Sequence, residues 1–468
     1  CSRKRELGEV TGERIEGRRT TLPAMLAEFF TDKGKFIPEA LAARILHEYS
    51  LLTFKDTREI YCYDGATGVW KPNGDTVVHA AVQRILGEHT KKHYVEETLT
   101  CVRGNTYTER VGFVADPRYV NLQNGVLDLE TLTLRETDAA FHFLQQLPVR
   151  YDPDADCPKI RKFLEEVQPD EENRQALLEH LATTLDRDMR FQTAYLYWGE
   201  GENGRSTWLN VIRTILGPEN TTSQSLQSLE KDRFASAQLY GRLANICADM
   251  SADSLEQSSV FKETTGGDQI SAQHKFRGQF NFTNYAKHFF SANIFPITND
   301  KTYAFFRRMN IVEWKIRVPE EKRDRHLLEK LTTADELSGL VNLALKARKQ
   351  LHERDRFVNW RNVDDVQKMY LYRSDPVKAF IDDRIEQGPD YFVEREAVYV
   401  EFVTYCQQKR LEPLTVRDFI AHFRQTVPVT DYRPREKGDD YGGRRPRYWK
   451  GAQLRGAQKL DKHLGEQT

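Results

Sequence analysis

The chain has 468 residues, which is enough for roughly three domains of ordinary size. Charged residues make up 30% of it, and 69 Lys and Arg against 70 Asp and Glu leave a net charge of −1. Such a balance argues neither for nor against a polyanionic partner, so only local patches of charge are informative. No run of about 18 apolar residues is present, which excludes a predicted transmembrane helix.

The six cysteines indicate reduced thiols and a cytoplasmic protein. They form no Cys-x-x-Cys pair and no histidines lie at ligand spacing, so neither a disulfide framework nor a zinc module is predicted. The N-terminal segment is charged and lacks the apolar core of a signal peptide. Because the chain starts with Cys1 and not Met, we expect a processed product or a piece of a longer polypeptide.

Residues 1–150 are predicted to form an α+β domain. Apolar residues recur at helical spacing over 37–49, and two hairpins are indicated, around Asp64-Gly65 and over 119–134. The segment 151–158 carries two prolines, which push the residues before them out of the helical region. This segment therefore marks the boundary of the first domain.

A second domain, 151–357, reads as a three-layer α/β unit. Strand-like runs at 194–198, 243–248, 288–292 and 309–314 alternate with helical patterns. A third domain, 370–468, contains helical patterns at 376–387, 396–409 and 416–427.

The run GEGENGRST, Gly199–Thr207, has the spacing of a phosphate-binding loop, with Arg205 in place of the usual lysine. Glycines let backbone N–H groups turn toward phosphate oxygens, and the helix that follows adds its positive dipole end. Ser206 would place its hydroxyl on Mg²⁺, and a cation at position 205 would reach the β- and γ-phosphates of a nucleotide. The alternative is an ordinary glycine turn. The candidate residues are Gly199, Asn203, Gly204, Arg205, Ser206 and Thr207.

A phosphate loop of this kind needs an acid on a neighbouring strand to hold the metal. Asp249 follows a partly apolar run and is our candidate for this metal ligand. The alternative is a strand-end aspartate that caps the next helix. Met250 occupies the position of a second acid, which leaves Asp253 as a weaker candidate for a base.

Five segments in a fixed order resemble the superfamily 3 helicases, in the primase-helicase branch of phages, plasmids and poxviruses. The resemblance extends over about 119–357. It implies an AAA+-like P-loop ATPase core between the α+β domain and a C-terminal winged-helix domain. The segments are GEGENGRST, NICADMSAD, FKETTGGDQISAQHKFRGQFNF, KHFFSANIFP and FFRRMNIVEW.

The resemblance also implies roles for single residues. Asp249 would be the Walker B acid, and Asn293 a sensor of the γ-phosphate or of the attacking water. Arg307 or Arg308 would act as an arginine finger on the neighbouring subunit. The alternatives are a turn residue before Pro296 for Asn293 and a solvated arginine pair for the finger.

Two regions are candidates for DNA contact. The hairpin predicted over 265–282 resembles the family's pore hairpin, in which His274, Lys275 and Arg277 would meet the phosphates of a threaded single strand. An exposed hairpin with ordinary surface cations is the alternative.

In the C-terminal domain, 416–427 is the candidate recognition helix of a winged helix. Between Arg433 and Lys450 seven Lys and Arg face three Asp and Glu. This strip is the candidate wing, and a solvated charged loop is the alternative. Its candidate DNA contacts are Arg444, Arg445 and Arg447.

The resemblance implies an ATP-dependent ring helicase, a homohexamer acting on single-stranded and forked DNA. It would be the helicase part of a viral or plasmid primase-helicase, in the cytoplasm of a prokaryotic host or a virus-infected cell. No primase signature stands out before Tyr119, so a primase domain would precede Cys1 or belong to another protein. The alternative, motivated by Arg205, is a replication-origin or DNA-end binding protein whose nucleotide site assembles the ring but hydrolyses poorly.

Overall fold

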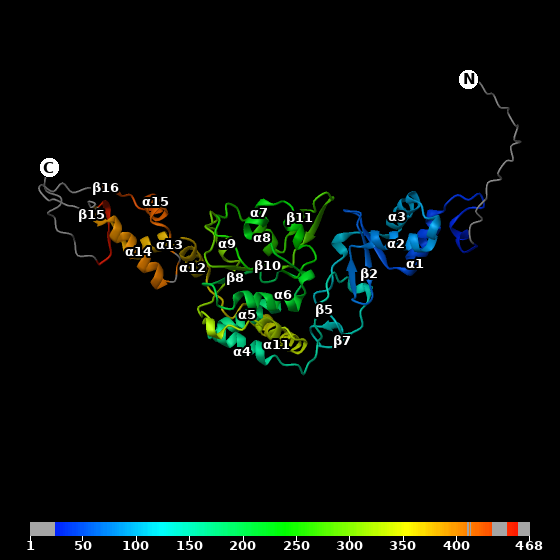
Figure 1. The fold of residues 1–468 in the computed structure, drawn as a ribbon, viewed down its shortest axis with the longest axis horizontal. Helices are drawn as coiled ribbons and strands as arrows, with labels where there is room; N and C mark the ends of the chain where they lie inside the picture. The colour runs from blue at the N-terminus through cyan, green and yellow to red at the C-terminus, as the bar shows by residue number, and fades with distance from the viewer. Residues whose placement is uncertain (1–23, 410, 412, 433–446, 457–468) are drawn as a thin grey trace, which may run out of the picture. The chain divides into compact units, whose positions relative to one another are not determined.

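The computed structural model describes residues 24–409, 411, 413–432 and 447–456 (Figure 1). The chain divides into two compact units. One comprises the described residues up to Tyr63 together with Lys71–Thr108, and the other comprises Asp64–Trp70 and the described residues from Glu109 onward.

The first unit combines helices with a small sheet. Strand β1 pairs antiparallel with β2 and parallel with β4. The apolar faces of the helices meet in a core that includes Leu41, Ile45 and Val82, all fully buried. The elements are the 3₁₀ helix η1 (Ala24–Phe29), helices α1 (Pro38–Glu48), α2 (Gly74–Leu86) and α3 (Lys92–Thr106), and strands β1 (Leu51–Phe54), β2 (Ile60–Asp64), β3 (Val69–Lys71) and β4 (Tyr107–Thr108).

The second unit opens with a short antiparallel sheet of order β5-β6-β7, formed by Tyr119–Leu122, Gly125–Asp128 and Leu134–Arg135. The predicted Asn-Gly turn lies between the first two strands. Gly125 has φ +134°, and a Cβ there would lie 2.6 Å from the carbonyl oxygen of Arg135. The turn therefore requires glycine.

A five-stranded sheet forms the centre of the second unit. Its order is β14-β8-β13-β10-β9, and every recorded pairing is parallel. The first strand in sequence, β8, therefore lies between the last two. The strands are β8 (Ala194–Trp198), β9 (Thr221–Thr222), β10 (Ala244–Cys247), β13 (Lys287–Ala292) and β14 (Met309–Glu313).

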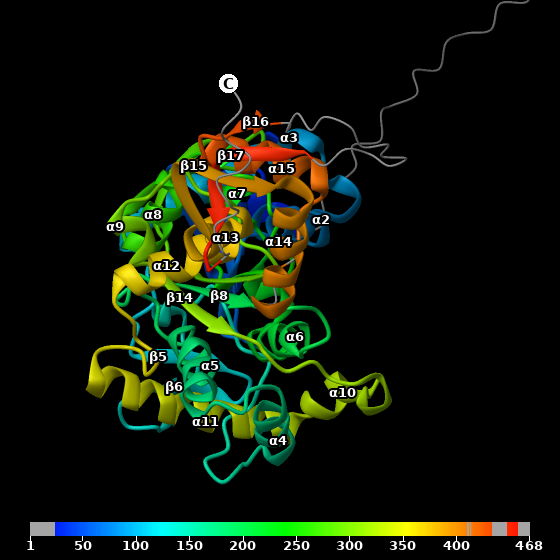
Figure 2. The same ribbon diagram turned by 90° about the vertical axis from the view of Figure 1, so that its left-hand side faces the viewer.

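Helices cover both faces of this sheet (Figures 1 and 2). Along β8, Tyr195 and Tyr197 face a core shared with α4, α5, α6 and α11, while Ala194, Leu196 and Trp198 face α7, α8, α9 and α12. Burial on both faces explains why β8 is apolar throughout. The helices are α4 (Pro158–Val167), α5 (Glu171–Thr183), α6 (Arg205–Leu216), α7 (Leu226–Lys231), α8 (Ser259–Gly266), α9 (Tyr303–Phe306), α10 (Leu327–Leu331), α11 (Ala334–Arg354) and α12 (Val363–Ser374).

Strands β11 (Gln269–Gln273) and β12 (Gln279–Thr283) form a separate antiparallel hairpin. Their residues alternate between buried and exposed, so one face carries Ile270, Ala272, Phe280 and Phe282 into a small apolar cluster. The other face and the turn remain exposed.

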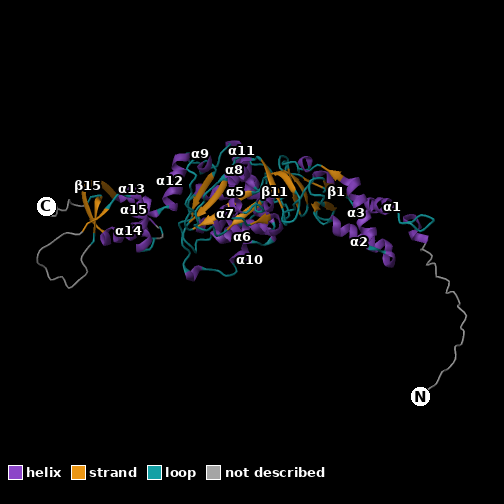
Figure 3. Ribbon diagram, turned by 90° about the horizontal axis from the view of Figure 1, so that it is seen from above, coloured by secondary structure: helices purple, strands orange, loops and turns teal. Residues whose placement is uncertain are grey.

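The C-terminal region packs three helices against a small sheet (Figure 3). Phe402, Phe419 and Trp449 are fully buried where α14, α15 and β17 meet. The antiparallel sheet has the order β15-β17-β16. The elements are α13 (Pro376–Arg384), β15 (Ile385–Glu394), α14 (Arg395–Lys409), α15 (Val416–Thr426), β16 (Thr430–Tyr432) and β17 (Tyr448–Leu454).

The described chain is a mixed α/β protein with several sheets, as predicted. The helix predicted over 376–387 is wrong at its end, because α13 stops at Arg384 and Ile385 begins a strand that pairs with Leu454. The division into three domains stays a prediction. In the part of the chain that the structure describes, no helix has the length and apolar character needed to cross a membrane.

Candidate functional site

The predicted phosphate loop connects β8 to α6. The chain leaves β8 toward β9 at one side of the sheet and leaves the neighbouring β13 toward β14 at the other, so connections from adjacent carboxyl ends run in opposite directions. Ligands of open parallel sheets bind at such a point. The loop therefore lies at the edge of the sheet where a ligand site is expected.

Two of the three loop glycines are required by their surroundings. A Cβ on Gly199 would lie 2.4 Å from the carbonyl oxygen of Trp314, and one on Gly204, at φ +87°, would lie 2.7 Å from Val167. Nothing lies within 4 Å of the corresponding point on Gly201. Gly199 and Gly204 thus pack the loop against the protein, while Gly201 faces open space.

Polar side chains hold the loop from inside and outside. Asn203 is buried, and its amide donates to the carbonyl of Glu200 within the loop. Glu202 lies on the outer side, where its carboxylate contacts Arg317 at 2.8 Å and Arg323 at 2.6 Å. These two arginines lower the pKa of Glu202. The loop is therefore fixed before any ligand binds.

The guanidinium of Arg205 is turned into the protein. The side chain is 6% exposed, and five hydrogen bonds are recorded for its five N–H donors. Burial lowers its pKa to about 10, and the charge of Asp249 opposes this shift. The acceptors are the carbonyls of Tyr197 (3.2 Å), Ala292 (2.6 Å) and Glu200 (3.4 Å) and the side-chain oxygens of Asn203 (3.1 Å) and Asn293 (2.6 Å).

Asn293 and Asp249 lie at the same edge as the loop. Asn293 follows β13, and its carbonyl accepts a hydrogen bond of 2.7 Å from the indole of Trp198. Asp249 follows β10 by two residues and is exposed. Ser206 is exposed in the first turn of α6, whose N–H groups have no acceptor within the helix. The structure therefore brings together the predicted loop, acid and sensor residues.

This edge suits a magnesium nucleotide. Ser206 and Asp249 offer oxygen ligands, and Mg²⁺ commonly takes one or two protein oxygens together with phosphates and water. Gly201 leaves the space beside the loop open. Among the described residues, no group of three or more His, Cys, Asp or Glu could hold a metal by itself. The chain's own residues thus fit a metal that arrives with phosphate better than a permanent metal centre.

Arg307 and Arg308 lie at the opposite edge of the sheet. Met309 pairs with Ala194 and Glu313 with Trp198, so both arginines precede the start of β14, while the loop follows the end of β8. Arg307 is exposed and donates to the side chain of Gln192 at 2.7 Å. Within one chain neither arginine is at the loop.

Arg308 is much less accessible than its neighbour. It is 7% exposed and donates to the carbonyl of Ala304 at 2.6 Å, and burial lowers its pKa. Arg307 is therefore the better placed of the two predicted finger residues to reach another subunit.

The predicted DNA-binding hairpin presents an aromatic residue that sequence reasoning missed. Phe276 is 93% exposed at the turn, with φ +64°, and lies between exposed Lys275 and Arg277. The Lys275 ammonium lies 5.2 Å from the centre of its ring. The sequence did contain a signal for Phe276 as a candidate DNA contact, because it is an aromatic residue between two cations in a predicted turn.

His274 contributes differently from the residues at the turn. Its ring stacks on Phe280 at 5.3 Å, and burial, together with the charges of Arg110 and Arg242, lowers its pKa. It supports the hairpin and offers little surface to a ligand.

The C-terminal DNA candidates are only partly described. Arg444 and Arg445 lie outside the described residues. Arg447 is exposed just before β17, and its carbonyl accepts from the backbone of Arg395 at 2.9 Å. The candidate recognition helix, α15, buries Phe419 and Phe423 and leaves its opposite face exposed.

One residue near the predicted phosphate loop was not anticipated. Arg373 of α12 lies 3.5 Å above the ring of Trp198 and contacts Glu313 at 2.8 Å. Because the Trp198 indole donates to Asn293, Arg373 connects the helix that leads into the C-terminal region with the sensor position.

Comparisons with known proteins found two family models. Residues 42–169 match a family described as D5 N terminal like, and residues 197–308 match a family of unknown function, DUF5906.

Curated relatives are distant and longer than this chain. A candidate helicase of Invertebrate iridescent virus 3 is 20% identical over 358 residues, which are 68% of this chain and 38% of the relative. A candidate primase of African swine fever virus is 19% identical over 334 residues, which are 65% of this chain and 34% of the relative. The chain thus spans less than two fifths of the length of either relative.

Among solved structures, the apo structure of the NrS-1 C terminal region is similar. The TM-score is 0.50 at 12% identity, and the match covers 88% of this chain and 99% of the other. At this identity the likeness concerns the fold.

Proposed function

We infer that this chain is an ATP-driven replicative DNA helicase. Its family match and its relatives show that it is related to the viral primase-helicases. The observation that carries this proposal is the meeting of the glycine loop, Asp249 and Asn293 at the switch point of the parallel sheet. The proposed core is a P-loop ATPase of the AAA+ type.

In the proposed site, backbone N–H groups of the loop and the first turn of α6 bind the phosphates of ATP. Ser206 and Asp249 would hold Mg²⁺, whose charge would offset that of the phosphates. Asn293 orients the attacking water, and its contact with Arg205 fixes the side-chain amide. Arg205 supplies positive charge to the site but does not bind the phosphates directly, because all its side-chain N–H groups already donate to protein oxygens.

The placement of Arg307 supports a ring. An arginine finger at the far edge of the sheet can complete a nucleotide site only on a neighbouring copy, through a heterologous interface that closes by rotation. We propose a homohexamer in which Arg307 acts in this way, with Arg308 supporting the segment from inside.

The hairpin supports a contact with single-stranded DNA in the pore of that ring. Lys275 and Arg277 would meet phosphates, and Phe276 would stack on a base. The C-terminal region, as a winged helix, would bind the forked duplex through α15 and Arg447. A primase would act beside it, as a domain or as a separate protein.

Hydrolysis measured with Mg²⁺, with and without single-stranded DNA, tests the proposal. We expect stimulation by the strand, unwinding of a forked duplex, and loss of at least about a hundredfold in hydrolysis for Asp249→Asn, which removes a metal ligand. Absence of turnover in the unmodified protein, with and without DNA, would contradict the enzymatic proposal.

A second candidate follows from Arg205. Since all five of its N–H groups are bound to protein oxygens, Arg205 has no N–H left to offer a phosphate as the lysine of ordinary P-loops does. This favours a protein that assembles on ATP at a replication origin or DNA end and hydrolyses poorly. Ring formation on ATP without turnover would support this second candidate.

A further inference from the structure

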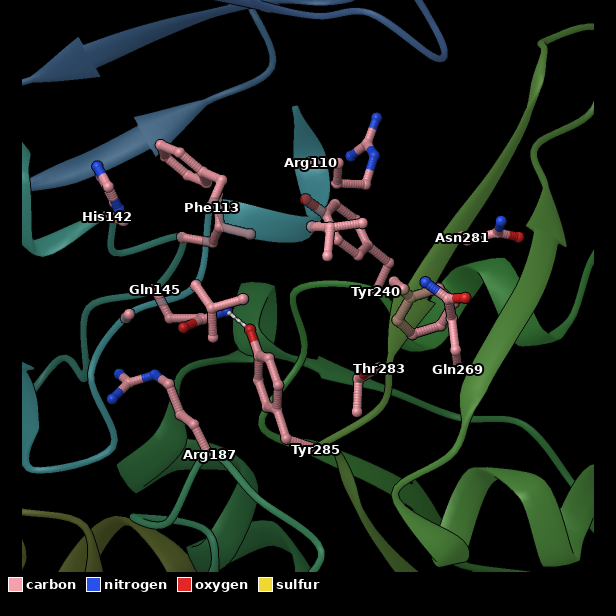
Figure 4. Close-up of a pocket in the computed structure, with 15 residues that line it drawn as sticks. Arg110, Phe113, His142, Gln145, Arg187, Tyr240, Gln269, Asn281, Thr283 and Tyr285 are labelled. Carbon is pink, nitrogen blue, oxygen red and sulfur yellow. Dashed lines mark hydrogen bonds between the residues drawn. The ribbon is translucent and has the colours of Figure 1, made fainter. Parts of the chain in front are cut away.

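A cavity of about 130 Å³ lies beside the hairpin and away from the nucleotide edge (Figure 4). Its walls come from the segment that precedes the β5-β6-β7 sheet, from the segment that follows it, and from the β11-β12 hairpin, together with Arg187, Tyr240 and Tyr285. Gln269 and Thr283, which pair at the base of the hairpin, both line it. The hairpin turn that carries Phe276 is at the other end of the same two strands.

The lining is apolar and cationic. Phe113, Phe282 and Tyr240 supply aromatic surface, and Arg110 and Arg187 supply positive charge. None of the lining residues is Asp or Glu. In a chain with a net charge of −1, such a lining disfavours a cationic ligand and suits one that is aromatic and electron-rich or anionic.

Gln145 presents a buried acceptor that has no partner. The residue is 1% exposed, and its side-chain NH₂ donates to the carbonyl of Gly241 at 2.8 Å and to the hydroxyl of Tyr285 at 2.7 Å (Figure 4). Because the Gly241 carbonyl can only accept, the orientation of the amide is fixed. Its Oε1 is left buried without a hydrogen bond, which is unfavourable for a polar atom.

Arg187 presents the complementary donor. It is 7% exposed, its Nη1 donates to the carbonyl of Tyr119 at 2.5 Å, and its guanidinium lies 4.9 Å from the centre of the Phe143 ring. Its Nε is buried and has no acceptor. Both atoms have less than 1 Å² of accessible surface, so a ligand in the cavity reaches this acceptor and this donor only when the neighbouring side chains shift.

The volume of the cavity distinguishes a ligand with a single ring from a larger one such as a whole nucleotide. An apolar cavity of about 150 Å³ holds a single benzene-sized ring. This cavity is similar in volume, so it accommodates one ring but not a ring together with a sugar and phosphates. A nucleobase combines one such ring system with neighbouring hydrogen-bond donors and acceptors.

We propose that this cavity binds one nucleobase, presented by a single strand of DNA or by a free nucleotide. The base packs between the aromatic walls, and its sugar and phosphate remain outside. A shift of the neighbouring side chains on binding lets the base donate to Gln145 Oε1 and accept from Arg187 Nε. The strand-bound form rests on the proposed function, because it places a base of the bound strand at the foot of the hairpin. The free-nucleotide form does not depend on it.

The experiment compares two strands of equal length and charge, one of deoxythymidine and one of abasic units, in the absence of ATP. Val114→Trp fills the mouth of the cavity, since Val114 lines it and is 57% exposed. Leu134→Trp is the matched control, on β7 and 40% exposed. Gln145→Met is a second variant that removes the buried acceptor, used once its melting curve shows that it folds.

For the strand-bound base, the unmodified protein and Leu134→Trp bind the thymidine strand at least about fivefold more tightly than the abasic strand. Val114→Trp and Gln145→Met lose that preference and keep their affinity for the abasic strand. If the cavity binds a free nucleotide, equilibrium dialysis should detect binding of deoxynucleoside monophosphates. Val114→Trp should abolish this binding, and Asp249→Asn, which changes the predicted ATP site, should not.

The proposal is overturned if Val114→Trp changes neither the strand preference nor the binding of monophosphates. Because no ATP is present, this result is independent of hydrolysis. If the protein fails to hydrolyse ATP but shows the strand preference, the proposed ATP-driven helicase is contradicted and the proposed binding of a base in the cavity is supported.

Discussion

Arg205 is the residue whose role the sequence and the structure describe differently. The spacing of the loop predicts a cation directed at the β/γ-phosphates. The structure instead gives its guanidinium five protein acceptors, three of them carbonyls at or just beyond the ends of β8 and β13. Arginine suits this position because only its fork can serve so many acceptors at once.

Arg205→Lys should lower the melting temperature and change hydrolysis by less than about threefold. An ammonium has three donors, so at least two acceptors lose their partner, at about 1–3 kcal/mol each. Arg44→Lys is the control, because that arginine is on α1 and its side chain is 55% exposed. Thermal melting and steady-state hydrolysis check the prediction. A rise in hydrolysis of tenfold or more would instead support the assembly protein that hydrolyses poorly.

Phe276→Ala should weaken binding of single-stranded DNA by about 1–3 kcal/mol, the value of one base stacked on an aromatic ring. The melting temperature should not fall, since the ring is 93% exposed. Fluorescence anisotropy with a labelled strand measures the affinity. Tyr303→Ala, at a residue 68% exposed on α9, is the control. Equal losses in the two variants would show that the hairpin has no special role.

At the scale of the element, the phosphate loop depends on glycine unequally along its length. Gly199→Ala should destabilise the protein and weaken nucleotide binding at least tenfold, because the new Cβ meets the backbone of Trp314 at 2.4 Å. Gly201→Ala has open space and should keep the melting temperature within about 1 °C, since surface changes cost little. Melting curves and nucleotide titrations would contradict this account if the two variants behaved alike.

The central sheet should lose stability as the pH falls below about 6.5. His180 and His288 are fully buried, and burial lowers the pKa of each to about 3. Tyr197 and Asn310 face His180, and Asn245 and the charged Lys287 are next to His288. Each histidine binds its proton more readily in the unfolded chain, so folding loses about 1.4 kcal/mol per pH unit per histidine between about 6.5 and 3.

Denaturant unfolding between pH 6.5 and about 5, above the range in which most carboxylates titrate, measures this slope. His288→Gln should reduce it by the contribution of one proton. His326→Gln, at a histidine whose side chain is 71% exposed, should leave it unchanged. A slope that is the same in all three proteins would contradict the prediction.

Several elements could be predicted from local patterns because local physics determines them. Apolar runs buried on both faces predict β8 and β13, and the Asn-Gly pair predicts the turn at Gly125. The end of α13 could not be predicted in this way. Its last turn gives way to β15 because Ile385 pairs with Leu454, a partner about seventy residues away.

In the candidate site, too, some features could be predicted from the sequence and others depend on distant contacts. The sequence predicts which residues follow the strand ends, and the parallel sheet brings them to one edge. It does not predict that Arg205 turns inward or that Arg373 covers Trp198, since both depend on packing between distant segments. The resemblance to viral primase-helicases is confirmed by the relatives. The roles of single residues stay predictions.

At the scale of the whole molecule, the two edges of the sheet carry different parts of the proposed catalytic site. One edge carries the loop, Asp249 and Asn293, and the other carries Arg307. In the proposed ring, a single chain holds two halves of different catalytic sites, so assembly is required for activity. Chains with defects at different edges should then complement one another when they are mixed.

The most direct test mixes equal amounts of Asp249→Asn and Arg307→Ala, each inactive alone, and measures ATP hydrolysis. Since one chain keeps an intact loop edge and the other an intact finger, roughly a quarter of the interfaces in a random ring should recover activity. Mixing Asp249→Asn with Asn293→Ala should recover none, because both changes damage the same edge. Full activity of Arg307→Ala alone, or no recovery in the first mixture, would contradict the account.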